Sequence, residues 1–408
     1  MHFVFLYPQL KNLTGAQRLI LELAGAIAAT PGDRHRVTLL THTVSPACRA
    51  AIPAGVGLCE GGFNLNRTPN HYLNSLLEYF STPFLLKQLS QLERESGEKI
   101  SALCFFGPPS LPGLWWGKHL RRLKTPLFYF CYEPPRAAYT DISEVSRAWA
   151  GRVNGLVKPL FRLYRPVDRY LTRQASAVLV NGRYGQSLIR ETYGLPSIVI
   201  THGAELPQPP DPITAANQIR ARFGLAGKRI ILTVNHLHPR KRVNLQLEAL
   251  SLLLPKYPDV GLLVVGSGPE AQNLRDLAAQ LGIGDSVVFA GFVSDEELAA
   301  CYAVASVYLH SGRAESFGLS VLEASAAGLP IVAADEGGPR DIIVEGQTGF
   351  LVQANPAAFA AKLEWLLTHP TEAHEIGRKG AVRVVQHFTW QQGAQDFLSA
   401  LSSLSPEK

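Results

Sequence analysis

The stretch Val307–Val352 decides the fold, and it reads VYLHSGRAESFGLSVLEASAAGLPIVAADEGGPRDIIVEGQTGFLV. Its continuously apolar runs Val307–His310 and Pro330–Ala334 are typical of strands buried on both faces. Between them, Ser320–Ala327 has the length and composition of a helix. A strand, a helix and a strand in this order form a right-handed crossover between parallel strands. The stretch therefore predicts an α/β fold with a parallel sheet.

The same alternation runs through both halves of the 408-residue chain. Further strands are expected at His2–Tyr7, Arg36–His42, Ala102–Phe106, Leu127–Tyr132, Ala177–Asn181, Ile198–Thr201, Arg229–Asn235, Gly261–Gly266, Ser286–Gly291 and Phe350–Val352. Helices are expected at Ala16–Ala29, Asn70–Ser90, Leu245–Leu254, Glu270–Leu281, Asp295–Ala303 and Ala357–Leu367. The Pro-rich segment Leu206–Pro212 predicts a linker. We therefore expect two doubly wound, Rossmann-like domains, 1–205 and 206–387, that face a central cleft.

Two glutamates of the opening stretch, Glu315 and Glu323, are separated by seven residues with Gly318 between them. A helix that begins near Leu319 offers free backbone N–H groups and the positive end of its dipole, which suit a diphosphate. Glu315 would precede this helix, and Glu323, one turn inside it, would reach a second point of the same ligand, such as a ribose diol. The alternative is a pair of solvated glutamates on a helix surface.

The stretch resembles the signature block of retaining glycosyltransferase family 4, whose members carry an E-x7-E motif on the GT-B fold of two Rossmann-like domains. The resemblance covers essentially the whole second half of the chain and is weaker in the first half. Its other segments are Val264–Glu270 (VVGSGPE), Phe289–Ser294 (FAGFVS), Tyr7-Pro8, Thr14-Gly15-Ala16 and Phe128–Arg136 (FYFCYEPPR). It implies that a C-terminal helix, Trp390–Leu404 within 388–408, crosses back to the first domain.

The resemblance also implies roles for individual residues in binding a nucleoside diphosphate sugar. Glu323 would hold the ribose, and Glu315 the hydroxyls of the donor sugar. Backbone N–H groups would contact the sugar and the diphosphate from Phe317, Gly318, Leu319 and Ser320. The other matches are a base-binding loop at Phe292 and Val293, a turn at Gly268 that lets the backbone approach the ligand, and a glycine loop at Gly15 that closes over the pyrophosphate.

The segment Val234–Leu245 (VNHLHPRKRVNL) follows the first strand of the second domain. The family carries there an arginine and, about five residues later, a lysine that clamp the leaving diphosphate. Lys241 matches the lysine; the arginine position is occupied by His236, or its role has passed to Arg240 or Arg242. Fixed cations at this point would stabilise the charge that develops on the leaving group. For the residues other than Lys241, the alternative is a solvated basic loop.

The strand end Phe128–Arg136 departs from the family pattern. Many relatives have a histidine that contacts the donor sugar where this chain has Tyr132, which can still donate a hydrogen bond. Glu133 would act as a general base on the acceptor hydroxyl, or it would pair with Arg136. These alternatives leave Tyr132 and Glu133 as candidate catalytic residues of the first domain.

The net charge of +6 has a local origin. Segment 147–173 contains seven basic residues and one acid, Asp168, and so carries the whole excess. A nucleic-acid-binding surface is therefore not expected, because phosphate tracking needs basic residues spread over a broad face. On a helical wheel from Val157 to Arg173 one face collects Lys158, Arg162, Arg165, Arg169 and Arg173. The opposite face collects Val157, Leu160, Tyr164, Val167 and Leu171, and Pro166 is expected to kink the helix.

This helix has two interpretations. In the first, its apolar face packs on the first domain and its cations are solvated. In the second, the cations attach the protein to an anionic membrane surface, at about 1 kcal/mol each. These cations are Lys158, Arg162, Arg165 and Arg169. In the second case Trp149, Val153, Leu156 and Phe161 would be available to insert.

The cysteines and the N-terminus indicate a compartment. The five cysteines are widely spaced and form no C-x-x-C pair, so we expect reduced thiols and no zinc site. The N-terminus has no basic n-region and no small-residue cleavage site, so it is not expected to be a signal peptide. We expect a cytoplasmic protein, also found at the cytoplasmic face of a membrane.

Together these features predict a retaining glycosyltransferase that moves a hexose from a nucleoside diphosphate sugar to a hydroxyl acceptor, with no metal or other cofactor. Phe128–Arg136 and Asn235–Leu245 are similar to mannosyltransferases that extend polyprenol-linked oligosaccharides, which favours GDP-mannose as the donor. The acceptor would be lipid-linked or a growing polysaccharide. Alternatives are a catalytically impaired nucleotide-sugar-binding or partner protein, because His236 and Tyr132 replace family residues, and a GT-B epimerase.

Overall fold

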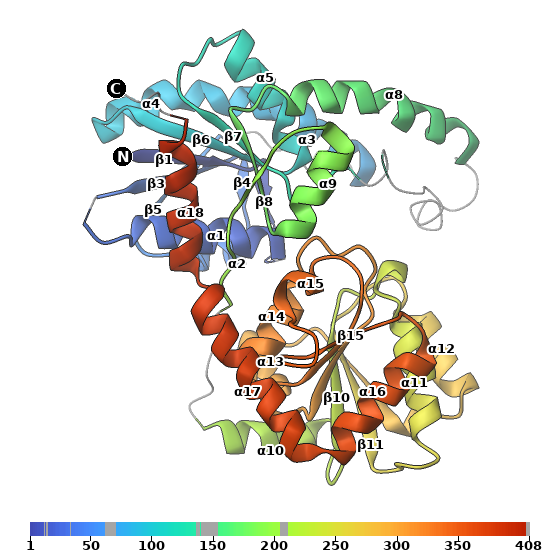
Figure 1. Ribbon diagram of the computed structural model, residues 1–408. Helices are drawn as coiled ribbons and strands as arrows, with labels where there is room; N and C mark the ends of the chain where they lie inside the picture. The colour runs from blue at the N-terminus through green and yellow to red at the C-terminus, as the bar shows by residue number, and fades with distance from the viewer. Residues whose placement is uncertain are drawn as a thin grey trace. The chain divides into compact units, whose positions relative to one another are not determined.

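The computed structural model describes residues 1–11, 13, 15–32, 34–61, 71–135, 139, 154–204 and 211–404, except the side chains of 71–76, 154–162 and 212. The chain forms two compact units (Figure 1). Unit 1 comprises Met1–Gly203 and Thr389–Lys408, and unit 2 comprises Ala204–Phe388. The expected boundary after residue 205 lies two residues beyond the observed one, and that after residue 387 lies one residue before it.

Unit 1 is built on a parallel sheet, which in its described residues has seven strands in the order β5-β3-β1-β6-β7-β8-β9. The strands are β1 (His2–Leu6), β3 (Arg36–Thr41), β5 (Val56–Glu60), β6 (Ile100–Phe106), β7 (Leu127–Phe130), β8 (Ala177–Val180) and β9 (Ile198–Val199). A separate parallel pair joins β2 (Gln9–Leu10) and β4 (Thr43–Val44). The six strands expected in this half all form, with each end within two residues of its predicted place.

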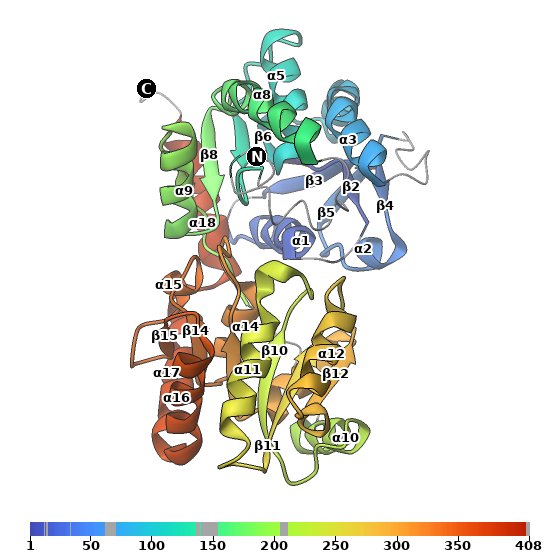
Figure 2. The same ribbon diagram turned by 90° about the vertical axis from the view of Figure 1, so that its right-hand side faces the viewer.

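Helices cover both faces of this sheet. They are α1 (Gly15–Ala28), α2 (Pro46–Ala50), α3 (His71–Leu85), α4 (Leu89–Ser96), α5 (Leu111–His119), α8 (Asn154–Thr172), α9 (Arg183–Tyr193) and α18 (Trp390–Ser402). Phe3 and Phe5 of β1 pack in one core layer with α1 and α18, and Val4 and Leu6 pack in the other with α3 and α5. Figure 2 shows α3, α5 and α8 over one side of the sheet and α1 over the other.

The C-terminal helix α18 completes the core of unit 1. Phe397 is fully buried, and its ring centroid lies 5.5 Å from those of both Phe3 and Phe5. At the start of the helix, a Cβ on Gly393 would lie 2.3 Å from the carbonyl oxygen of Thr201. Helix α18 is therefore part of the first domain's core.

Unit 2 contains, in its described residues, a six-stranded parallel sheet in the order β12-β11-β10-β13-β14-β15. The strands are β10 (Arg229–Val234), β11 (Val260–Val265), β12 (Val287–Gly291), β13 (Val307–His310), β14 (Ile331–Ala334) and β15 (Phe350–Val352). With β10 taken as first, the order is 3-2-1-4-5-6, which is the doubly wound Rossmann arrangement. The predicted α/β class and the two Rossmann-like domains are confirmed.

The helices of unit 2 include three that the sequence patterns did not predict, α10, α15 and α17. The full set is α10 (Pro212–Arg222), α11 (Val243–Leu253), α12 (Ala271–Gln280), α13 (Asp295–Val304), α14 (Leu319–Ala326), α15 (Pro339–Ile342), α16 (Pro356–Thr368) and α17 (Pro370–His387). The predicted linker 206–212 extends too far, because Pro212 is the first residue of α10 and Asp211 caps that helix by accepting from the N–H groups of Ile213 and Thr214. Residues 206–210 lie outside the described part of the chain.

The predicted buried face of α8 is only partly confirmed, because Tyr164 and Leu171 pack on unit 1 but Val167 does not. Val167, placed on the buried face, is 48% exposed, whereas Asp168 and Thr172 are fully buried. Asp168 can face inward because Tyr193 donates to its Oδ2 at 2.8 Å, and the nearby hydroxyls of Tyr139 and Tyr164 oppose the cost of burying the charge. The helix also continues through Pro166 to Thr172.

Candidate active site

The carboxyl ends of β10 and β13 lie side by side where the sheet of unit 2 changes direction. The chain continues from β10 to β11 on one side, and β13 pairs with β10 on the other. Ligands of doubly wound sheets bind at this switch point, outside the carboxyl ends of the strands. The loop after β10 carries Lys241, and the loop after β13 carries Glu315, so the fold brings the two strongest predicted segments together.

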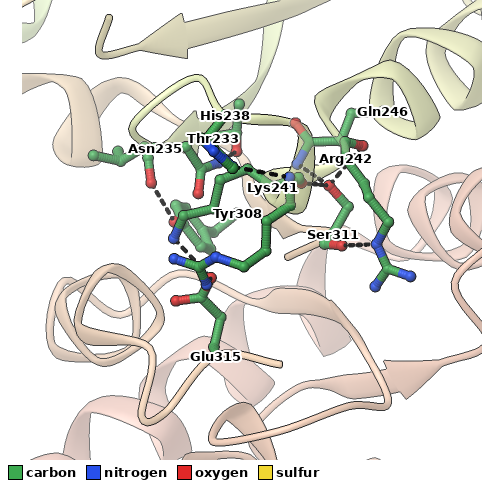
Figure 3. A network of polar contacts seen from close by, with 11 residues as sticks. Thr233, Asn235, His238, Lys241, Arg242, Gln246, Tyr308, Ser311 and Glu315 are labelled. Carbon is green, nitrogen blue, oxygen red and sulfur yellow. Dashed lines mark hydrogen bonds and ion pairs between the residues drawn. The ribbon is translucent and has the colours of Figure 1, made fainter. Parts of the chain in front are cut away.

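Ser311 connects these two loops (Figure 3). Its hydroxyl donates to the carbonyl oxygen of Lys241 at 2.7 Å and accepts from Nε2 of the buried Gln246 at 2.8 Å. Nε of Arg242 donates to the carbonyl oxygen of Ser311 at 2.8 Å. These three bonds hold the basic loop against the end of β13. Sequence reasoning did not find Ser311 or Gln246, because neither residue type indicates a site by itself.

Glu315 lies at the centre of the site and contacts two cations. Lys241 Nζ is 2.8 Å from Oε1 of Glu315, and Arg240 donates from Nη1 to the same oxygen. The glutamate is 8% exposed. Burial alone would raise the pKa of Glu315, but Lys241 and then Arg240 lower that pKa to about 2. The carboxylate is therefore ionised at any physiological pH.

The backbone around Glu315 is held by the Glu336-Gly-Gly-Pro339 segment. Gly338 N–H donates to the carbonyl oxygen of Glu315 at 2.8 Å. A Cβ on Gly338 would lie 2.3 Å from the Cα of Phe317, so only glycine allows this close approach. Phe317 itself is buried, with its ring centroid 6.1 Å from that of Phe388.

Helix α14 begins directly after this turn and presents an anion-binding end. Gly318 is its N-cap residue, with φ of +99°, a conformation that favours glycine. The N–H groups of Leu319 and Ser320 have no acceptor within the helix, as at any helix start, whereas Val321 N–H donates to Gly318 O at 2.9 Å. Glu323 follows one turn later, where Tyr302 donates to its Oε2 at 2.9 Å. Tyr302, on the preceding helix α13, is a further site residue that sequence spacing could not reveal.

The contacts in the structure distinguish the candidates for the arginine position, which are His236, Arg240 and Arg242. Arg240 meets Glu315, whereas Arg242 pairs with Glu336 at 3.1 Å and adopts a left-handed backbone with φ of +49°. His236 is exposed on the loop before them. Arg240 is thus the arginine that the fold places beside Lys241 and Glu315.

The predicted base-binding residues differ in their exposure. Phe292 follows β12 and is 87% exposed, whereas the adjacent Val293 is 7% exposed and packs in the core with Cys301 and Tyr302. The Phe292 ring is therefore available to stack on a flat ligand, and Val293 can contribute to a site only through its backbone.

Gly268 approaches the backbone of the basic loop closely. A Cβ on Gly268 would lie 2.4 Å from the carbonyl oxygen of Leu237. Leu237 N–H donates to Ser267 O at 2.8 Å, and Glu270 N–H donates to Leu237 O at 3.0 Å. In the structure this glycine therefore fixes the loop after β11 against the basic loop.

In unit 1, Gly15 and Tyr132 lie close together at the carboxyl ends of β1 and β7. Gly15 is the first residue of α1, and the Tyr132 hydroxyl is 3.5 Å from the carbonyl oxygen of Ala16. Burial raises the pKa of Tyr132 well above its ordinary range, so the phenol stays protonated. Glu133 is half-buried, and its predicted partner Arg136 lies outside the described residues.

The four residues proposed for membrane attachment all lie on α8. The side chains of Lys158 and Arg162 are outside the described part. Arg165 and Arg169 lie over the ring of Tyr139, at 5.5 and 5.9 Å from its centroid. Arg169 Nε also donates to Thr192 O at 3.0 Å. These two arginines are therefore partly engaged by unit 1.

Two negative findings apply to the described residues. In them, no group of three or more His, Cys, Asp or Glu side chains is arranged to hold a metal ion. No described helix is both long enough and apolar enough to cross a bilayer.

Two family models match the chain. Residues 14–202 match the model described as a glycosyl transferase 4-like domain, and residues 216–383 match the model described as glycosyl transferases group 1. The two matches divide the chain as the two units do. The second match includes Lys241, Glu315 and Glu323, and the first includes Gly15, Tyr132 and α8.

Curated relatives match part of the chain. A GDP-mannose-dependent alpha-(1-6)-phosphatidylinositol monomannoside mannosyltransferase of Mycolicibacterium smegmatis is 32% identical over 239 residues, which is 56% of this chain and 62% of that protein. A D-inositol 3-phosphate glycosyltransferase of Streptomyces avermitilis is 39% identical over 186 residues, 43% of this chain and 40% of that protein. These matches thus span about two fifths to three fifths of the relatives' lengths.

Solved structures share the fold at low sequence identity. Anabaena HepE in complex with UDP and glucose superposes with a TM-score of 0.70 at 20% identity, over 98% of this chain and 99% of that one. Sucrose-phosphate synthase from Thermosynechococcus elongatus superposes with a TM-score of 0.73 at 20% identity, over 99% and 98%. These likenesses cover nearly the full length of the chain and confirm the GT-B fold.

Proposed function

The chain belongs to the GT-B glycosyltransferases of family 4, as its matches to these two models show. We propose that it transfers a hexose from a nucleoside diphosphate sugar to a hydroxyl acceptor, with retention of the anomeric configuration. The observation that carries the proposal is the cluster of Lys241, Arg240 and Glu315 at the switch point of unit 2. Two cations and a helix N-terminus at one place suit a diphosphate leaving group.

Each part of the site has a role in the proposal. Lys241, Arg240 and the first N–H groups of α14 stabilise the charge that grows on the diphosphate as the glycosidic bond breaks. Glu315 positions the sugar hydroxyls, and Glu323, oriented by Tyr302, binds the ribose diol. Phe292 stacks on the base. No protein nucleophile is involved, so the acceptor oxygen attacks from the face that the diphosphate leaves.

GDP-mannose is the proposed donor, and a lipid-linked hydroxyl is the proposed acceptor. Support comes from the Mycolicibacterium relative, whose name specifies GDP-mannose and a phosphatidylinositol mannoside. On the acceptor side, Glu133 is the candidate general base, and Tyr132 supports the start of α1 through its contact with Ala16.

The test is donor binding followed by turnover. GDP-mannose, UDP-glucose and ADP-glucose are compared by thermal shift, since a ligand at a hundredfold excess over its Kd stabilises a protein by about 2.7 kcal/mol. We expect GDP-mannose to give the largest shift, and Lys241→Ala and Glu323→Ala each to reduce it and to slow release of GDP. Failure of every nucleoside diphosphate sugar to raise the melting temperature would refute the proposal.

The same experiment distinguishes the proposed glycosyltransferase from the two alternative functions, a catalytically impaired binding protein and an epimerase. A catalytically impaired binding protein would show the thermal shift but release nucleoside diphosphate only at the background rate. An epimerase would isomerise the nucleotide sugar without an acceptor. A product with the anomeric configuration of the donor, measured by NMR, supports retention.

We also propose that unit 1 docks on an anionic membrane surface. Seven exposed apolar side chains support this proposal, and together we call them the outer apolar face: Phe80, Phe84, Trp116, Leu120, Leu163, Val167 and Tyr170. They lie on α3, α5 and α8, with Leu120 directly after α5, and these helices cover one side of the sheet. The only other large hydrophobic side chain exposed in the described residues of unit 1 is Met1. Arg165 and Arg169 lie on the same helix as the last three and would meet lipid phosphates.

The membrane proposal is tested by liposome flotation. We expect the wild type to float with vesicles that contain phosphatidylglycerol, and to do so less at high salt. Leu163→Ser with Val167→Ser should reduce flotation, whereas Val385→Ser, at a still more exposed apolar site of unit 2, should not. A wild type that never floats would leave the outer apolar face without this role.

A further inference from the structure

The cations that we assign to the donor's diphosphate already hold an anion. Lys241 and Glu315 face each other (Figure 3), with Lys241 Nζ 2.8 Å from Oε1 of Glu315. Arg240 contacts the same oxygen. All three side chains are mostly buried, at 14%, 23% and 11% exposure for Lys241, Arg240 and Glu315. An ion pair in such surroundings is only weakly screened by water and salt.

We infer that Glu315 is an internal counter-ion, which the donor's diphosphate displaces from Lys241 and Arg240 and which returns to them when the sugar has been transferred. This inference rests on the proposed function. It adds that Glu315 makes the site distinguish the intact donor from the spent nucleoside diphosphate.

The charges of the donor and of the product explain why a carboxylate that competes for Lys241 and Arg240 is needed. When the glycosidic bond breaks, the leaving nucleoside diphosphate gains negative charge on its terminal phosphate. An uncompensated pair of cations would therefore bind the product more tightly than the donor. With the donor bound, the displaced carboxylate can accept hydrogen bonds from the sugar hydroxyls. Once the sugar has left, these partners are gone, and the carboxylate competes again for Lys241 and Arg240.

The surroundings of Glu315 allow its side chain to exchange partners while its backbone stays fixed. The carbonyl oxygen is held by Gly338 N–H at 2.8 Å. Next to the carboxylate, a Cβ on Gly312 would lie 3.0 Å from Oε1, so this glycine leaves room beside it. The buried His310 is also close, since the same Cβ would lie 2.7 Å from its Nε2. Burial lowers the pKa of His310 to about 4, so its ring is neutral and does not retain the carboxylate as a third cation would.

The variant Glu315→Gln separates the two roles of the residue, because glutamine keeps the size and hydrogen-bonding capacity but loses the charge. The probes are GDP, UDP and inorganic pyrophosphate, with Kd measured by calorimetry. We expect Glu315→Gln to bind pyrophosphate and the nucleoside diphosphate about tenfold more tightly than the wild type, or better. Turnover of the donor should fall, and inhibition by the product should increase.

Glu336→Gln is the matched control. It neutralises the carboxylate that pairs with Arg242 at 3.1 Å in the same region, and it should leave the Kd of every probe within about twofold of the wild type. Tightening in both variants alike would show a general effect of charge and would overturn the inference.

The other outcomes are equally distinct. If the wild type binds a nucleoside diphosphate and Glu315→Gln binds it no more tightly, the exchange is overturned and the proposed function stands. If the wild type binds none of the probes, the proposed function fails. A crystal structure of the wild type with GDP gives a measurement that does not depend on the variant's folding. It should show the Lys241–Glu315 contact broken, and an intact contact would contradict the exchange.

Discussion

Tyr302 orients the glutamate that we assign to the donor's ribose. Its hydroxyl donates to Glu323 Oε2 at 2.9 Å and lies 3.3 Å from Ser320 O, so one phenol fixes both the carboxylate and the first turn of α14. Tyr302→Phe keeps the ring in the core and removes one hydrogen bond to a charged group, worth about 1.5 kcal/mol. We expect the donor KM in steady-state kinetics to rise about tenfold, with a smaller change in kcat.

A similar tyrosine elsewhere in unit 2 provides the control. Tyr257 donates to Glu364 at 3.0 Å, and Tyr257→Phe should leave the donor KM unchanged. If Tyr302→Phe also leaves it unchanged, Glu323 does not depend on this hydrogen bond.

Residue types and motif order predicted which residues gather at the site, but not how they pair. Lys241 and Glu315 were both predicted, from segments 74 positions apart in the sequence. Their contact at 2.8 Å depends on the pairing of β10 with β13, which no local pattern contains. Tyr302 was missed because a buried tyrosine in a helix is usually a core residue. The close approach of Gly268 to Leu237 was not predicted either, because it joins two loops that are distant in the sequence.

At the scale of elements, Asp168 anchors α8 through a carboxylate without a buried cation. Desolvation raises its pKa above the ordinary value near 3.8, although hydrogen bonds from Tyr193, Tyr139 and Tyr164 oppose the shift. The folded protein therefore binds a proton more readily than the unfolded chain, and protonation stabilises the fold as the pH falls through the raised pKa. In urea titrations, the unfolding free energy of Asp168→Asn minus that of the wild type should be largest at pH 7 and decrease towards pH 4.

Asp259 gives a control of opposite sign. Arg229 lowers the pKa of this exposed carboxylate, so the wild type loses stability here as the pH falls. The same difference for Asp259→Asn should increase towards acid pH. A difference for Asp168→Asn that stays constant over the whole range would mean that the carboxylate titrates normally.

Elements with continuous apolar runs were predicted well. β13 has the predicted ends, because a strand buried on both faces leaves a run of apolar residues. β5 was missed because its sequence, VGLCE, is only partly buried and contains no such run. The buried face of α8 was partly misjudged because the wheel considered only basic and apolar residues, whereas Asp168 lies inside the unit and accepts from Tyr193.

At the scale of the whole molecule, strand and helix alternation was enough to predict two Rossmann-like domains. Alternation implies parallel strands, and the right-handed crossover rule then restricts the topology to very few choices. The positions of the boundaries depended instead on Pro-rich composition, which placed Pro212 in a linker although it begins α10. Membership of the last helix in unit 1 followed from the family resemblance and not from its local sequence.

Helix α18 completes the core of unit 1 although it lies far from the rest of that unit in the sequence. This arrangement leads to a prediction about the cooperativity of unfolding. Phe397 of α18 is fully buried among Phe3, Phe5 and Phe128, and Phe397→Ala should cost about 3–5 kcal/mol. Because these partners belong to unit 1, hydrogen exchange should accelerate in β1 and α1 while unit 2 stays protected. Phe359→Ala, at a fully buried site of unit 2, should give the reverse pattern. Accelerated exchange in both units for either variant would mean that they unfold as one cooperative body.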